Sequence, residues 1–145
     1  MKRVPSARWF CALALATCLA GCRREPDEQA LRRTIAEMEV AVEQGDHRDF
    51  LDHFDAQFAG NGGDMDLRQL RATLAALSLR HEQLGVTLGP IDVKLFDDRA
   101  TIRFEALATG GSWMPQTGQM LEVESHWKRV DGQWRCFAAD WKERW

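Results

Sequence analysis

The chain has 145 residues, 45% of them apolar and 28% charged, and a formal net charge of −3 at pH 7. This composition is typical of a globular protein and excludes a disordered or fibrous chain. The negative charge, without a basic cluster interleaved with aromatic residues, argues against nucleic acid or anionic lipid as the main partner, because both bind basic surfaces.

The first 21 residues have the pattern of an export signal. Three basic residues, Lys2, Arg3 and Arg8, precede a largely apolar run over residues 9–20, which is too short to span a bilayer because a span takes about 20 residues. The sequence Leu19-Ala20-Gly21-Cys22 follows this run and resembles the lipobox of bacterial lipoproteins. The alternative is an ordinary secretory signal with a chance cysteine after small residues.

The lipobox resemblance implies a protein anchored to a membrane on its periplasmic side. It implies that diacylglycerol is attached to the Cys22 thiol, that residues 1–21 are removed, and that the new N-terminus is acylated, for example with palmitate. Two or more acyl chains anchor a protein stably, whereas one chain does so only marginally. In bacterial lipoproteins, Asp directly after the Cys favours the inner membrane, so Arg23 at this position favours the outer membrane.

The predicted mature chain contains one domain. Removing 21 residues from 145 leaves 124, which is a common size for one domain and too few for two cores. The net charge changes from −3 to −6, because the signal removes three basic and no acidic residues. We expect a tether over residues 22–28 and a domain over residues 29–145.

Cysteine usage agrees with lipidation. Cys11 and Cys18 leave with the signal and Cys22 becomes a thioether, so Cys136 is the one thiol expected in the mature chain. An intramolecular disulfide is therefore excluded even in an oxidising compartment. Cys136 falls in an apolar strand pattern, where a buried inert cysteine is more common than a nucleophile.

The first half of the domain predicts three helices. The first has an apolar stripe at helical spacing and ends at Gly45: Leu31, Ile35, Met38 and Val42. The second begins at the N-cap Asp46 and ends at the glycines of residues 60–63, with the stripe Phe50, Leu51, Phe54 and Phe58. The third is capped by Asp64 or Asp66 and ends at Gly85, with the stripe Leu67, Leu70, Leu74, Leu77, His81 and Leu84.

The second half predicts an antiparallel sheet. Alternating apolar residues mark one strand at residues 91–95 and a second at residues 100–108, joined by a turn at Asp97-Asp98. A glycine-rich loop leads to a third strand at residues 121–127, and Asp131-Gly132 gives the strongest hairpin signal. The last strand runs from Gln133 to Trp141. These elements predict an α+β domain, in which the sheet buries its apolar face against the helices.

This order of elements resembles the NTF2-like superfamily, the cone-shaped fold that nuclear transport factor 2 shares with ketosteroid isomerase, scytalone dehydratase and the SnoaL-like cyclases. The resemblance covers residues 27–141. It rests on the helix order, on the break Glu43-Gln44-Gly45-Asp46, and on the closing hairpin over residues 127–135. It implies three N-terminal helices packed on a curved antiparallel sheet around a cavity. The alternative is another small α+β domain with the same pattern.

No metal or cofactor is predicted. His47, His53, His81 and His126 fall in different elements without paired ligand spacing, and no phosphate-binding glycine loop is present. The acidic residues around His53 are expected to form a solvated face. His126 alternates with Glu122, Glu124 and Lys128, which places it on the outer, polar face of the sheet.

Two residues could meet in the cavity that the resemblance implies. His81 lies in a leucine stripe and should point toward the sheet, while Asp140 shares a strand face with Trp134 and Cys136 if that strand is regular. Such a pair could act as base and orienting acid, because burial and pairing tune a His near neutral pH. The alternative is a semi-buried histidine and a solvent-exposed aspartate. The Tyr and Asp pair of ketosteroid isomerase has no counterpart, since the chain has no Tyr.

Two tryptophans complete the candidate ligand-binding set. Trp127 lies on the apolar face of the third strand, and Trp113 interrupts the glycine-rich loop, where it could cap the core or contact a partner.

Three functional hypotheses follow from the sequence. The leading one is a non-catalytic, lipid-anchored NTF2-like domain in the periplasm that binds a small apolar ligand or an envelope protein. The second is an acid–base lyase or isomerase that uses His81 and Asp140. The third is homodimeric assembly through the outer face of the sheet, which its alternating charges disfavour as a dry interface.

Overall fold

The computed structural model of the chain describes residues 25–80, 83–110 and 118–144. The signal, the lipobox, Cys22, His81 and Trp113 lie outside the described residues. Within the described ranges, no helix combines the length and the apolarity that crossing a bilayer requires.

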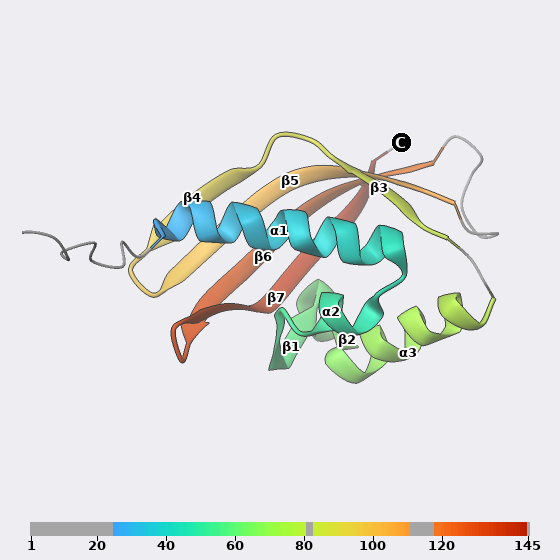
Figure 1. The fold of residues 1–145 in the computed structure, drawn as a ribbon, viewed down its shortest axis with the longest axis horizontal. Helices are drawn as coiled ribbons and strands as arrows, with labels where there is room; N and C mark the ends of the chain where they lie inside the picture. The colour runs from blue at the N-terminus through green and yellow to red at the C-terminus, as the bar shows by residue number, and fades with distance from the viewer. Residues whose placement is uncertain (1–24, 81–82, 111–117, 145) are drawn as a thin grey trace, which may run out of the picture.

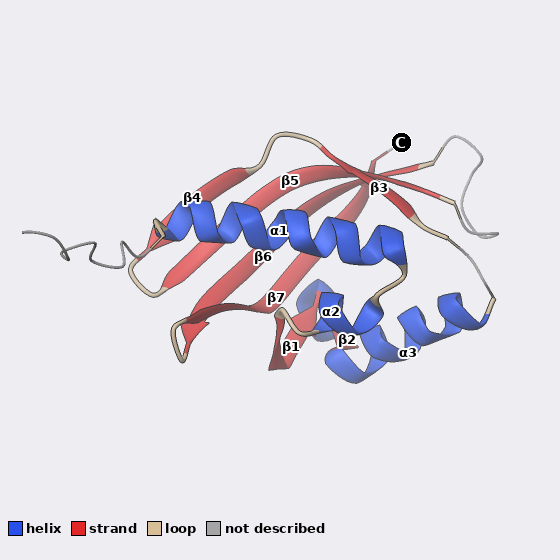
Figure 2. Ribbon diagram, in the orientation of Figure 1, coloured by secondary structure: helices blue, strands red, loops and turns tan. Residues whose placement is uncertain are grey.

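The first helix, α1 (Asp27–Gln44), agrees with the predicted stripe. Its first turn contains Asp27 and Glu28, whose negative charges suit the positive end of the helix dipole. Leu31, Ile35 and Met38 are buried on one face, and α1 lies across the sheet with this face inward (Figures 1 and 2). The helix ends where Gly45 adopts a left-handed conformation with φ of 71°.

The predicted second helix is wrong beyond its first turn and a half. Asp46 caps α2 (His47–Leu51) by accepting a hydrogen bond from the Asp49 amide, but the chain then continues as the strand β1 (Phe54–Gly60). Phe54 and Phe58 caused the error. A spacing of four places two residues on the same side of a strand as well as of a helix, so this pattern fits both structures.

The third helix begins as predicted but ends earlier. After the short elements η1 (Asn61–Gly63) and β2 (Met65–Asp66), Asp66 and Gln69 cap α3 (Leu67–Leu79) by exchanging two side-chain-to-backbone hydrogen bonds of 2.7 Å. Leu74 and Leu77 are buried on α3, whereas Leu79 is 83% exposed.

The sheet contains seven strands and is mixed. Its order is β2-β1-β7-β6-β5-β3, and β4 also pairs with β5. The strands after α3 are β3 (Gly85–Leu88), β4 (Asp92–Phe96), β5 (Arg99–Thr109), β6 (Gln119–Val130) and β7 (Gln133–Arg144), all with antiparallel neighbours among themselves. The strand β1 runs parallel to β7.

The α+β class is confirmed, but two details of the predicted arrangement are wrong. The three helices do not all precede the sheet, because β1 and β2 lie between α2 and α3. The sheet is not purely antiparallel, because β1 pairs with the distant last strand rather than with a sequence neighbour. This long-range pairing leaves no signal in local periodicity.

A β-bulge divides β7 into two halves. Trp127 pairs with Cys136 and His126 pairs with Ala138, so Phe137 is an extra residue between them. The residues beyond the bulge therefore face opposite to a regular continuation of the strand. Ala139 and Trp141 face inward, and Asp140 faces outward and is exposed.

The buried apolar residues form two clusters rather than one core. The larger cluster joins α1 to the sheet and contains Leu31, Ile102 and Trp127, which are at most 1% exposed. The smaller cluster joins Leu51 of α2 to Leu74 and Leu77 of α3. Leu74 therefore belongs to the smaller cluster and does not share one core with Leu31.

Candidate functional site

An apolar cavity of about 310 Å³ lies between the helices and the inner face of the sheet. Its position follows from the fold, because α1 covers one face of a curved sheet (Figure 1). Residues of both the helix and the sheet line the cavity. Large apolar side chains dominate the lining, including Met38, Phe50, Phe54, Phe58, Phe104 and Trp141. This volume is at the lower end of the range for small-molecule sites, about 300–1,000 Å³.

Three polar side chains in the lining have partners in the protein. The Ser125 hydroxyl accepts a 2.9 Å hydrogen bond from Trp127 Nε1 and donates a 3.3 Å one to the carbonyl of Ile102. Glu39 Oε1 accepts from the Leu88 amide at 3.3 Å, where the edge strand β3 meets α1. These bonds fix the orientation of the lining and satisfy polar groups that would otherwise be costly to bury.

Cys136 also lines the cavity, but its chemistry is that of a buried thiol. Its side chain is 2% exposed, and its Sγ donates a 3.4 Å hydrogen bond to the Ala138 carbonyl. Burial raises the pKa of this thiol to about 12, because the thiolate is poorly solvated there. A thiolate nucleophile is therefore disfavoured, in agreement with the sequence prediction.

The structure separates the predicted site residues. Trp127 lies in the cavity lining, as expected from its strand face. Asp140 does not, because the bulge turns it to the opposite face, where its Oδ1 accepts a 3.0 Å hydrogen bond from the Gly62 amide. The expected convergence of Asp140 with the face of Trp134 and Cys136 is therefore wrong. His81 and Trp113 lie outside the described residues.

Trp141 lines the cavity, although a regular strand with Asp140 on the inner face would place its neighbour Trp141 on the outer face. The first residue of η1 holds its backbone, since Asn61 Oδ1 accepts a 2.9 Å hydrogen bond from the Trp141 amide. Gly60 lies directly against the Trp141 ring, and a Cβ at this glycine would come within 2.9 Å of the ring. The sequence shows the glycine-rich segment and the tryptophan, but only the bulge brings them together.

The outer face of the sheet is polar, as predicted for His126. The His126 Nδ1 lies 3.3 Å from Thr101 Oγ1, and its Nε2 lies 3.4 Å from Glu124. Arg103 Nε is 2.6 Å from Glu124 and holds the pKa of that carboxyl below its usual value. These charges are paired within the chain and leave the surface hydrophilic.

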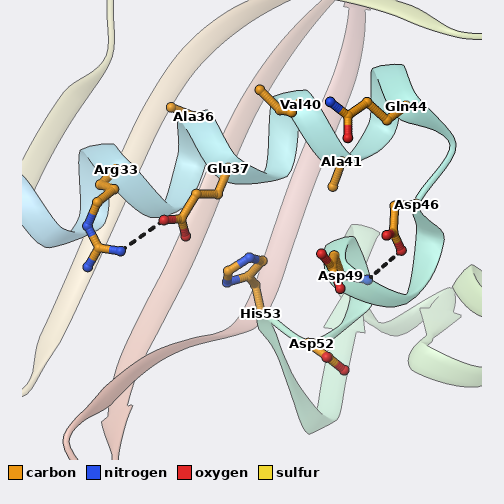
Figure 3. Close-up of a pocket in the computed structure, with 10 residues that line it drawn as sticks. All are labelled: Arg33, Ala36, Glu37, Val40, Ala41, Gln44, Asp46, Asp49, Asp52 and His53. Atoms are coloured by element: carbon orange, nitrogen blue, oxygen red, sulfur yellow. Dashed lines mark hydrogen bonds and ion pairs between the residues drawn. The ribbon is translucent and has the colours of Figure 1, made fainter.

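A second concavity of about 610 Å³ lies on the surface of the domain, between α1 and α2 (Figure 3). The His53 ring projects into it from the end of α2, facing Glu37 on α1. Burial lowers the pKa of His53 most, and Arg135 lowers it further, while Glu37, Asp52 and Asp49 oppose the shift. The half-buried His53 side chain therefore favours its neutral form.

Two of the acidic residues that line this cleft already have local roles. Asp46 caps α2, and Glu37 forms a 2.9 Å ion pair with Arg33 (Figure 3). Arg33 also pairs with Glu25. Among the described residues, no group of three or more His, Cys, Asp or Glu side chains is arranged to hold a metal ion. The cleft was not predicted from the sequence, although acids at every third position from Asp46 to Asp52 mark one side of a turn.

Comparisons with solved structures define the fold. Neither a protein-family model nor a curated protein sequence matches the chain. An NTF2-like protein from Cytophaga hutchinsonii superimposes with a TM-score of 0.69 at 14% identity, covering 83% of this chain and 100% of that one. A candidate scytalone dehydratase from Novosphingobium aromaticivorans gives a TM-score of 0.67 at 14% identity, covering 81% of this chain and 84% of that one.

A third solved structure has the same overall fold. A candidate dehydratase of the NTF2-like family from Streptomyces avermitilis also gives a TM-score of 0.67 at 14% identity, covering 81% of this chain and 95% of that one. At such low identity the similarity defines the fold and transfers no activity. The described domain therefore has the NTF2-like fold, which is also called cystatin-like, as the resemblance implied.

Proposed function

We propose that this chain is a lipid-anchored protein of the bacterial outer membrane, on its periplasmic side, whose NTF2-like domain binds a small apolar ligand in the inner cavity. The observation that carries the ligand proposal is the cavity of about 310 Å³ with its apolar lining. The anchor proposal rests on the lipobox Leu19-Ala20-Gly21-Cys22.

The lining favours binding through apolar contact rather than polar recognition. Ser125, Cys136 and Glu39 already form hydrogen bonds within the protein. A polar ligand group placed beside the aromatic and aliphatic side chains would lose its water without gaining an equal partner. An apolar ligand gains about 25 cal/mol for each Å² removed from water, so a hydrocarbon or aromatic body fits this cavity best.

The alternative of an acid–base lyase or isomerase has less support. It needs a base and an orienting acid in the same cavity, and Asp140 lies on the outer face with Gly62 as its partner. A homodimer through the outer face is the third alternative. The intrachain pairs of Glu124 with Arg103 and His126 already satisfy charges there, which reduces the gain from a second copy.

Filling the cavity tests the ligand proposal. Ala106 is 6% exposed and lines the cavity, so Ala106→Phe should occupy the space that a ligand needs. We expect the affinity for N-phenyl-1-naphthylamine, an apolar fluorescent dye, to fall about tenfold or more, equivalent to about 1.4 kcal/mol. The matched control is Ala75→Phe on the exposed side of α3. Equal dye affinity in the two folded variants would contradict the proposal.

A separate experiment tests the anchor. Cys22→Ser removes the thiol that forms the thioether, so the precursor should keep its signal and incorporate no labelled fatty acid. Equal incorporation into the variant and the unaltered chain would exclude lipidation at Cys22.

A further inference from the structure

Three exposed apolar side chains lie at one end of the domain, beside two hairpin turns. Six large apolar residues of the described chain are at least 36% exposed: Val40, Leu79, Leu95, Phe96, Met120 and Val130. Three of these lie beside the turns of two hairpins, namely Leu95 and Phe96 beside the β4–β5 turn and Val130 beside the β6–β7 turn. Phe96 is the one aromatic residue of these six, and its side chain is 59% exposed. We call these three residues the tip patch.

One arginine joins both hairpins to the start of α1. The Arg129 amide donates a 2.9 Å hydrogen bond to the Asp98 carbonyl in the β4–β5 turn, next to Phe96. The Arg129 guanidinium pairs with Asp27, the first residue of α1, and lies 4.8 Å from the centre of the Trp134 ring. Both hairpin turns and the first turn of α1 therefore lie at one end of the domain, and α3 lies toward the other (Figure 1).

The distance from Cys22 to α1 limits how far this end can lie from a lipid anchor. Four residues separate Cys22 from Asp27, so the two are five residue steps apart. An extended chain spans at most about 3.6 Å per step, or about 18 Å in total. Lipid chains on Cys22 would hold the first turn of α1 within that distance of the acyl region. The tip patch, joined to Asp27 through Arg129, lies at this same end.

We propose that the tip patch contacts the surface of the membrane that carries the Cys22 lipid, with Phe96 inserted among the headgroups. This inference rests on the lipid anchor of the proposed function and adds an orientation to it. Aromatic and aliphatic side chains bind at the membrane–water boundary when they can bury apolar area there. The exposure of Phe96 is explained by this contact, since the side chain is buried in the membrane-bound protein.

The charges around the tip patch indicate which lipids it meets. Asp97, Asp98 and Asp131 occupy the two turns, and Arg99, Lys128 and Arg129 lie on the adjoining strands. Mixed charge gives no net attraction to anionic lipid. The contact therefore depends on apolar burial and on the anchor, and it should form on zwitterionic phosphatidylcholine and phosphatidylethanolamine.

A matched pair of labelled variants tests this orientation. Phe96→Cys and Leu79→Cys replace exposed apolar residues at the two ends of the domain, in the processed, lipidated protein. Each is labelled with the environment-sensitive fluorophore NBD, and Cys136 stays unlabelled because it is buried with a pKa raised to about 12. The proteins are reconstituted in phosphatidylcholine and phosphatidylethanolamine vesicles that contain a nitroxide-labelled lipid. Val130→Cys provides a second probe of the patch if the first variant folds poorly.

We expect the label at position 96 to shift its emission to the blue and to be quenched by the nitroxide lipid, while the label at position 79 keeps the emission of a water-exposed probe. The mass of the N-terminal peptide reports lipidation independently. A lipidated protein whose labels at positions 96 and 130 behave like the label at position 79 would overturn the orientation alone. A mature protein without lipid would overturn both the anchor and the orientation.

Discussion

Leu31 on α1 provides the most direct test of the core. Its side chain is fully buried, at 0% exposed, in the cluster that joins α1 to Ile102 and Trp127. Leu31→Ala removes buried methyl groups and leaves a void between a helix and a sheet that cannot easily collapse. The cost of such truncations is about 2.7–5.0 kcal/mol. We expect a value in the upper half of this range, about 4 kcal/mol, because three fully buried side chains meet here.

Two further leucines calibrate the measurement. Leu74→Ala, at 7% exposed in the smaller cluster, should cost about 2–3 kcal/mol, because fewer residues surround the void. Leu79→Ala, at 83% exposed, should stay within about 0.5 kcal/mol. Urea unfolding of residues 25–145, followed by tryptophan fluorescence, gives the free energy of unfolding of each variant. The three values are compared with the same dependence of this free energy on urea concentration. A loss at Leu79 equal to that at Leu31 would refute the assignment of faces on α1 and α3.

Three other predictions concern the cavity, its neighbouring loop and the outer cleft. Gly60→Ala should cost about 1–3 kcal/mol in urea unfolding and weaken dye binding, because the new Cβ pushes the Trp141 ring toward the cavity. Asp140→Ala should lower the free energy of unfolding by about 1 kcal/mol, because it removes the hydrogen bond to the Gly62 amide, and dye affinity should not change. A large loss of dye affinity would contradict the outward orientation of Asp140. The folded pKa of His53 lies below the unfolded value of 6.5, so the unfolded chain binds more protons as pH falls through 6.5 and stability decreases. Thermal unfolding between pH 7.5 and 5 should therefore show a larger drop in Tm for the unaltered chain than for His53→Gln, and identical drops would contradict this effect.

The sequence predicted the elements whose signals are local. The stripe of Leu31, Ile35 and Met38 with its glycine stop gave the limits of α1, and alternation gave β5 and β6 within a few residues. The Asp131-Gly132 hairpin was also confirmed between β6 and β7. In each case the residues that decide the structure are close together in the chain, so tertiary contacts only reinforce the local pattern.

The predictions are wrong where contacts between residues far apart in the sequence determine the structure. The spacing of Phe54 and Phe58 fits a helix, but pairing with β7 makes this segment a strand. The cavity could be inferred only from the fold resemblance, and the faces of Asp140 and Trp141 depend on a bulge that periodicity cannot show. A single extra residue reverses every later side chain of a strand, which is why candidate site residues near Trp141 were predicted less well than the fold.

The bulge at Phe137 also affects how this chain should be compared with other members of its fold. A homologue with the same number of residues in this strand but no bulge would present the position equivalent to Asp140 to the cavity and the position equivalent to Trp141 to solvent. Loss of the bulge through a shift of strand register by one residue would therefore exchange an indole for a carboxylate in the pocket while every amino acid stayed the same. An ungapped alignment across β7 would equate residues on opposite faces, so catalytic residues at this end of the strand should be transferred between relatives only after strand register has been compared.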